Sequence, residues 1–125
     1  MATIYRGRAK DRRVFVTRQE RDTIEISARE SQKVWNHSPD GFSWGYGGSG
    51  PAQLALALLI DRGENHGNAV RMHQDFKQDI IAALPMDKDF SIYAATIDNW
   101  IGAWQKEHER KTNEEEITHG AEPRA

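Results

Sequence analysis

The chain has 125 residues, of which 38% are hydrophobic and 29% are charged, and its formal net charge is −2. A chain of this size is expected to bury about two-thirds of its unfolded surface around one core. It has no cysteine, which excludes disulfides, thiolate chemistry and cysteine-based zinc sites. No segment reaches the roughly 18 continuous apolar residues of a membrane span, and no secretory signal is recognisable. We expect a cytoplasmic protein with no membrane contact.

The charges are unevenly divided along the chain. Residues 1–35 carry nine Lys or Arg and five Asp or Glu, whereas residues 36–125 carry eight and fourteen. Such a division can produce two surfaces of opposite potential. The simpler interpretation is that these charges are solvated on an exposed hairpin and on exposed helix faces.

Five short segments are predicted to be β-strands. Segments 3–9 and 13–18 alternate imperfectly between apolar and polar residues and are joined by a turn near Asp11, as in a β-hairpin. Segment 23–27 places Ile24 and Ile26 on one side. Segment 41–46 follows a turn-forming Ser-Pro-Asp-Gly sequence, and segment 89–93 is a further short candidate. Together they predict a small antiparallel sheet.

Three helices are predicted, two before the candidate strand at 89–93 and one after it. Residues 52–60 are apolar apart from Gln53, so this helix should be surrounded by protein at the centre of the core. Segment 68–84 is amphipathic, and a third helix runs from Ile97 to about Arg110. Its two tryptophans should close the core. The sequence thus predicts an α+β fold with one core over residues 1–110, followed by a mobile acidic tail at 111–125.

The glycine-rich loop before the central helix has two interpretations. Four glycines lie between Trp44 and Pro51, where positive φ angles and a helix start are expected. Three of them match G-x-G-x-x-G, but a second helix, not a parallel strand, comes after the first. Pro51 and Ala52 stand where a Walker A loop needs its lysine and hydroxyl residue. The loop is therefore structural, or it binds a small anion weakly through N–H groups near Ala52 and Gln53.

No catalytic residue, metal site or cofactor is assigned from the sequence. The five histidines form no H-E-x-x-H or facial-triad spacing. His37, Ser38 and Asp40 lie close in sequence, but Ser38 and Asp40 are typical turn residues, and Ser49 has no identifiable base. His73 is expected to be a partly buried helix residue. These observations leave enzymatic activity open and favour a non-enzymatic role.

The run NHSPDGFSWGYGGSGPAQLALALL, from Asn36 to Leu59, resembles a family of small proteins of unassigned function found in bacteria, plasmids and bacteriophages. The resemblance extends more loosely to segments 5–7, 76–77, 84–85 and 97–100, and so spans most of residues 3–104. It implies no activity and no catalytic residue. Carriage by mobile elements implies a modulator of a host or phage complex, including an inhibitor of a defence nuclease such as an anti-CRISPR protein.

We predict three alternative functions. The first is a protein-binding module whose partner loop, or alternatively ligand loop, contains His37, Ser38, Asp40, Trp44, Tyr46 and Ser49. The second is binding of a small anion or nucleotide at the glycine-rich loop, against which the missing phosphate-binding lysine counts. The third is nucleic-acid contact through Arg6, Arg8, Arg12 and Arg13, with Tyr5 or Phe15 for base stacking. The acidic net charge does not favour this third function.

Overall fold

A four-stranded antiparallel sheet forms one layer of the molecule. The computed structural model describes residues 2–19 and 21–120, with the backbone alone for 110–120. The strands are β1 (Ile4–Arg8), β2 (Arg13–Thr17), β3 (Thr23–Ile26) and β4 (Phe90–Tyr93). Their order is β3-β2-β1-β4, so the chain returns from the helices to pair β4 with the outer side of β1. Four of the five predicted strands are thereby confirmed.

The sheet has one buried face and one open face. Tyr5 of β1 pairs with Val16 of β2 and with Ile92 of β4, and all three side chains are buried. Directly paired residues point to the same face of a sheet, so these three define the core side. Arg6 and Arg8 alternate with them and are exposed on the other face, as their spacing predicts.

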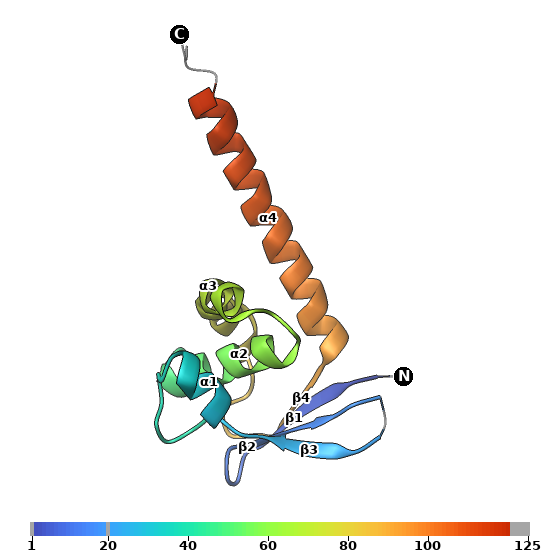
Figure 1. Cartoon of the computed structure of the whole chain (residues 1–125). Coiled ribbons are helices and arrows are strands. Elements are labelled where there is room, and N and C mark those ends of the chain that lie inside the picture. Colours follow the sequence, from blue (N-terminus) through green and yellow to red (C-terminus); the bar gives the residue numbers. More distant parts are fainter. Residues whose placement is uncertain (1, 20, 121–125) are drawn as a thin grey trace.

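The helices lie on the buried side of the sheet (Figure 1). They are α1 (Arg29–Val34), α2 (Ser49–Asp61), α3 (His66–Phe76) with the π-helical turn η1 (Lys77–Ile81), and α4 (Ala94–Gly120). Every residue of α2 from Gly50 to Leu59 is buried, which confirms the predicted central helix. Among the described residues, no helix covers the opposite face of the sheet. The α+β fold class with a single core is confirmed.

Two local predictions differ from the structure. Segment 41–46 is a loop and not a strand, because Gly41 and Gly45 have left-handed φ angles of 107° and 87°. Its alternating Phe42 and Trp44 are nevertheless buried, so the period of two reflects core packing by an irregular segment. The short helix α1 was not predicted, because its six residues contain no repeated apolar spacing.

The amphipathic helix changes register at its C-terminal end. The sequence predicts an apolar stripe through Phe76, Ile80 and Ala83, whereas the structure buries Phe76, Lys77 and Ile81 and leaves Ala83 outside the core. The cause is η1, in which Ala82 N donates to Lys77 O instead of the carbonyl four residues back. A π-helical turn accommodates one extra residue and so rotates the residues after it around the helix axis.

Helix α4 is longer than predicted. It continues to Gly120, past the expected end near Arg110, and rises away from the sheet and the other helices (Figure 1). Residues 111–116 contain lysine and three consecutive glutamates, which are good helix formers. The predicted mobility of 111–125 stays a prediction, and 121–125 lie outside the described residues. Within the described part, no helix combines the length and the apolar character needed to cross a membrane.

Candidate functional site

A buried glutamine fixes the segment that follows α1. Gln53 Oε1 accepts hydrogen bonds from His37 N (2.8 Å) and Ser38 N (3.0 Å). Its Nε2 donates to Ser31 Oγ (2.8 Å) and Trp35 O (3.1 Å). Both donors and both acceptor positions of the amide are thus satisfied inside the protein. This explains the one polar residue in an otherwise apolar helix, and it means that the backbone of residues 35–38 is held against α2.

Three aromatic rings meet where this segment contacts α3. His37 Nε2 lies 2.8 Å from His73 Nε2, and Trp35 stacks on His37 with ring centroids 4.5 Å apart. His73 Nδ1 lies 2.6 Å from Val70 O and must donate to it, which leaves His73 Nε2 to accept from His37 in the neutral pair. His73 is fully buried, but the Trp35 side chain is 48% exposed. The ring of Trp35 therefore offers its free surface to solvent.

Burial disfavours the charged form of both histidines. Burial is the largest cause of the lowered pKa of His37, followed by the electrostatic effects of His73 and Lys77. Burial also lowers the pKa of His73, against the opposing hydrogen bond to Val70 O, and Lys77 lowers it further. A neutral pair is consistent with one Nε2–H donating to the other Nε2.

Lys77 is the residue of this cluster that the sequence analysis missed. It follows His73 by one helical turn, at the start of η1, and only 9% of its surface is exposed. The Lys77 side chain makes no ion pair or hydrogen bond with any residue that the structure describes, although its backbone carbonyl accepts from Ala82 N. The sequence signal was a lysine directly beside Phe76 in an amphipathic helix, but the π-helical turn that buries it is not visible in apolar spacing.

Tyr46 lies beside the N-terminal end of α2. Its side chain is 43% exposed and its ring packs over Gly48, where a Cβ atom would lie within 3.0 Å of Tyr46 Cδ2. A Cβ at Gly50 would lie 2.7 Å from Ser43 Cβ and 3.4 Å from Tyr46 Oη. These glycines are thus required by close packing.

Trp35 and Tyr46 are both positioned by residues in the first turns of α2. Gly50, beside Tyr46, and Gln53, which binds Trp35 O, are three residues apart and so lie on the same face of the helix. Gln78 Nε2 approaches the position of a Cβ at Gly47 to 3.8 Å. We call the region formed by Trp35, His37, Tyr46 and Gln78 the Trp35–Tyr46 surface.

The other predicted loop residues are not gathered at this surface. Trp44 is fully buried, its Nε1 donates to Lys88 O (3.0 Å), and the Arg12 guanidinium lies 4.4 Å above its ring. Ser38 accepts from Gly41 N in a turn, as predicted. Asp40 is exposed at a surface hollow of about 560 Å³, and Ser49 lies at the start of α2 outside the buried core.

His37, Ser38 and Asp40, which lie close in sequence, do not form a hydrolytic Ser-His-Asp triad, because the side-chain partner of His37 is His73 and not a hydroxyl or a carboxylate. The expected anion site at the start of α2 also loses support. Ala52 N donates to Gly48 O (3.1 Å), and Pro51 has no N–H to offer. The N–H group of Ala52, which was expected to be free for an anion, is therefore engaged within the helix.

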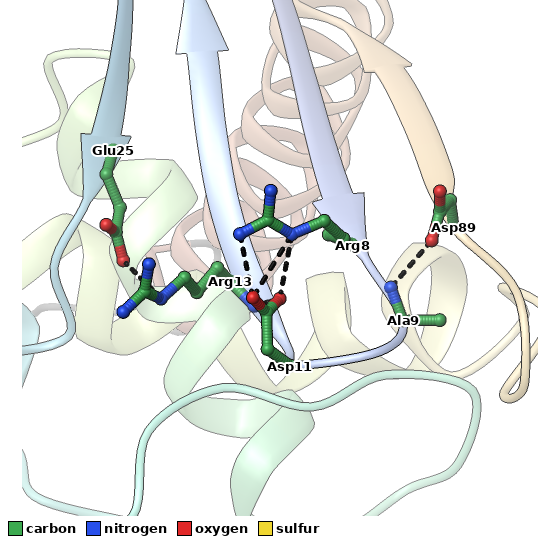
Figure 2. A network of polar contacts seen from close by, with 6 residues as sticks. All are labelled: Arg8, Ala9, Asp11, Arg13, Glu25 and Asp89. Atoms are coloured by element: carbon green, nitrogen blue, oxygen red, sulfur yellow. Dashed lines mark hydrogen bonds and ion pairs between the residues drawn. The ribbon is translucent and has the colours of Figure 1, made fainter.

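The arginines of the hairpin have partners within the protein (Figure 2). Arg8 binds Asp11 through two nitrogens, with the shorter contact at 2.7 Å, and this pairing lowers the pKa of Asp11 to about 2. Arg13 lies 3.7 Å from Glu25. Figure 2 also shows Asp89 accepting from Ala9 N (2.7 Å), which ties the end of β1 to the segment before β4.

The remaining hairpin candidates are divided between the two faces of the sheet. Arg12 donates to Met86 O (2.6 Å) and covers Trp44, whereas exposed Arg6 has a long bond of 3.4 Å to Thr17 Oγ1. Tyr5 is buried and donates to Asp61 Oδ2 (2.5 Å), and burial followed by this bond raises its pKa to about 12. Phe15 is the partly exposed aromatic residue of the pair proposed for stacking, and Arg8 lies over its ring.

The fold and the site define a small α+β scaffold that displays exposed aromatic side chains beside a buried central helix. Residues 5–103 match the model of a family of unknown function, DUF6166, and the chain belongs to that family. No curated protein and no solved structure matches the chain. Among the described residues, no group of three or more His, Cys, Asp or Glu side chains is placed to hold a metal ion.

Proposed function

We propose that this protein is a non-enzymatic binding module that engages a protein partner through the Trp35–Tyr46 surface. The observation that carries the proposal is the presence of two half-exposed aromatic side chains in segments that are both held by the first turns of α2. Tryptophan and tyrosine dominate the energetics of protein interfaces, because each buries a large area with few rotatable bonds.

The backbone beneath these side chains is already ordered in the free protein. The four hydrogen bonds of Gln53 hold residues 35–38, and close packing at Gly48 and Gly50 holds Tyr46. Binding a partner would therefore cost little conformational entropy in this loop, and a smaller cost raises the affinity for a given contact area. The resemblance to proteins of mobile elements extends the proposal to the partner's identity: a host or phage complex, including a defence nuclease.

Nucleic-acid contact through the hairpin stays a prediction with less support. Arg8 and Arg13 face carboxylates, and Arg12 lies over a buried tryptophan, so three of the four arginines named for it are engaged inside the protein. Phosphate contacts would have to compete with these pairings.

A capture experiment tests the proposal. The intact chain is immobilised, exposed to lysate of its native host, and compared with the double variant Trp35→Ala/Tyr46→Ala. We expect a stoichiometric protein partner to be lost from the double variant while the variant still unfolds cooperatively, since both side chains are about half exposed and lie outside the core. Tyr93→Ala is the matched control, because Tyr93 is 55% exposed on β4, on the open face of the sheet.

The control also separates the alternatives. Retention of the partner by the double variant, with loss from Tyr93→Ala, would place the binding surface on the open sheet and contradict the proposal. Capture of nucleic acid that falls steeply with salt would support the hairpin instead.

A further inference from the structure

Strand β3 forms a free edge of the sheet. It lies at one end of the strand order and pairs with β2 alone (Figure 1). Among the described residues, no backbone hydrogen bond outside the sheet involves residues 23–26. Every second residue of an edge strand directs its N–H and C=O groups away from the sheet. The outer edge of β3 therefore has backbone donors and acceptors to offer to a further strand.

The core-side face of β3 borders a surface hollow of about 450 Å³. Ile24 pairs with Val16, whose buried side chain belongs to the core side of the sheet. Ile24 is nevertheless 53% exposed, so the core does not cover it. The apolar residues that line the hollow come from β2, β3 and α2: Val16, Ile24, Ile26, Ala57 and Ile60. An apolar side chain placed beside Ile24 would fill space that the protein leaves open.

The charges around this hollow are predominantly acidic. The charged residues that line it are three acids and one base: Glu25, Glu30, Asp61 and Arg18. Asp61 and Arg18 pair with each other at 2.7 Å, which leaves the two glutamates. Each glutamate has a cation nearby, but the side chains of Glu25 and Glu30 are 46% and 76% exposed, and such surface pairs are weak. A segment that lies along β3 therefore meets negative charge, which favours a basic segment.

The alternation of β3 specifies where the basic residue of such a segment would stand. Glu25 lies between the two isoleucines of β3 and pairs with Phe15, so it belongs to the open face of the sheet. In an added strand, the residue opposite Glu25 lies on this open face, and its two neighbours lie over the hollow. A second copy of β3 is a poorer match, because it brings its own Glu25 to the same edge and like charges there oppose pairing.

We propose that the outer edge of β3 binds an extended segment of a partner protein in which a lysine or arginine stands between two aliphatic residues. The segment adds a strand to the sheet, as in other cases of recognition by strand addition. Its backbone pairs with β3, its aliphatic side chains enter the hollow beside Ile24, and its basic side chain pairs with Glu25. This site is separate from the Trp35–Tyr46 surface, because no residue of that surface lines the hollow.

Two acetylated and amidated peptides, GTIKISG and GTIEISG, test the site on the intact chain. They differ in the central residue alone, and the second contains TIEIS, the sequence of residues 23–27, so it imitates another copy of β3. In nuclear magnetic resonance spectra of the isotope-labelled chain, GTIKISG should shift the backbone amides of residues 23–26. We expect a dissociation constant of roughly millimolar for GTIKISG and binding about tenfold weaker for GTIEISG.

Three results would overturn the proposal. If the amides of residues 23–26 did not shift, the edge of β3 would not be the site. If the shifts lay at β4, the other edge of the sheet would bind the peptide. If GTIEISG bound as tightly as GTIKISG, the basic partner would be wrong and a second copy of this chain would be the better occupant.

Glu25→Lys should reverse the preference, so that GTIEISG binds more tightly than GTIKISG. The variant should fold, because Glu25 is exposed at the edge of the sheet. Asp87→Lys is the matched control, since it makes the same change of net charge at another exposed carboxylate. It should keep the preference for GTIKISG. If Asp87→Lys reversed the preference as well, general attraction to an acidic chain would explain the binding and the pairing with Glu25 would be wrong.

Methylation of the peptide nitrogens separates strand addition from binding by side chains alone. An added strand directs alternate N–H groups toward β3. One form of GTIKISG is N-methylated at its threonine and lysine, and the other at its two isoleucines. One form should bind like the parent peptide, and the other should lose binding because its methyl groups face β3. Equal binding of the two forms would overturn the backbone pairing.

Discussion

At the scale of single residues, Gln53 has the clearest structural consequence. It lies one helical turn inside the most apolar element of the chain, and it provides the internal partners of two backbone N–H groups, one hydroxyl and one carbonyl. In the sequence, Gln53 stands out as the one polar residue of the apolar segment 52–60, but its hydrogen-bonding role could not be predicted. The partners come from α1 and the following loop, and no local pattern brings those segments against α2.

Replacing Gln53 by leucine should destabilise the protein by about 2–4 kcal/mol. The side chain keeps its approximate volume, but Ser38 N loses its acceptor, His37 N keeps only Trp35 O at 3.2 Å, and the Ser31 hydroxyl loses its donor. Gln74→Leu is the matched control on α3, where the glutamine is exposed and a change within about 0.5 kcal/mol is expected. Urea unfolding monitored by tryptophan fluorescence measures both. Equal effects would show that the Gln53 network contributes nothing.

Residue patterns predicted burial better than they predicted roles. Trp44 and Tyr46 have the same alternation in the loop, yet one is fully buried and the other is half exposed. The difference arises from the positive φ of Gly45 between them, which turns the chain away from the extended path. Lys77 was not identified for a similar reason, because a backbone irregularity decided which face of the helix it occupies.

At the scale of elements, regular periodicity predicted four strands and three helices, and the irregular pieces were missed. The loop 41–48 and the turn η1 determine the site, and they interact directly: Gly45 N donates to Ile81 O (3.0 Å) at the end of η1. This hydrogen bond joins the irregular loop to the π-helical turn. Neither segment shows a periodic pattern of apolar residues from which it could be predicted.

A glycine series tests the packing of this loop. Gly45 has φ of 87° and a Cβ there would clash with the backbone of Met86, so Gly45→Ala should destabilise by about 3 kcal/mol or more. Gly63 has a similar φ of 96° but open space around it, so Gly63→Ala should cost only the backbone strain of about 1–2 kcal/mol.

Gly102 completes the series with the opposite sign. It lies in α4 with nothing within 4 Å of its Cβ position, and Gly102→Ala should stabilise by about 0.5–1 kcal/mol through helix propensity. Chemical denaturation of the three variants gives the order directly. If Gly45→Ala lowered the free energy of unfolding no more than Gly63→Ala does, the inferred close packing of the loop against Met86 would be contradicted.

At the scale of the whole molecule, the sheet packs on the central helix, and the central helix supports the Trp35–Tyr46 surface. Side chains of the sheet and of α2 share one core cluster, and α1 and α3 contact α2 directly. The first part of α2 positions the segments that carry both exposed aromatics. Helix α4 leaves this body, and its Trp100 and Trp104 anchor it through hydrogen bonds to Asp79 and Asp75. The binding surface is thus supported by the core, whereas α4 extends beyond it (Figure 1).

The central claim is that a partner binds at the Trp35–Tyr46 surface, and the tryptophan indole N–H groups test it most directly. Trp44, Trp100 and Trp104 each donate to an acceptor inside the protein, whereas Trp35 Nε1 has no acceptor among the described residues. In nuclear magnetic resonance spectra of the isotope-labelled chain, the captured partner should shift the Trp35 indole signal and leave the Trp44 signal in place. An unchanged Trp35 signal, with shifts confined to the amides of β1 and β4, would contradict the claim.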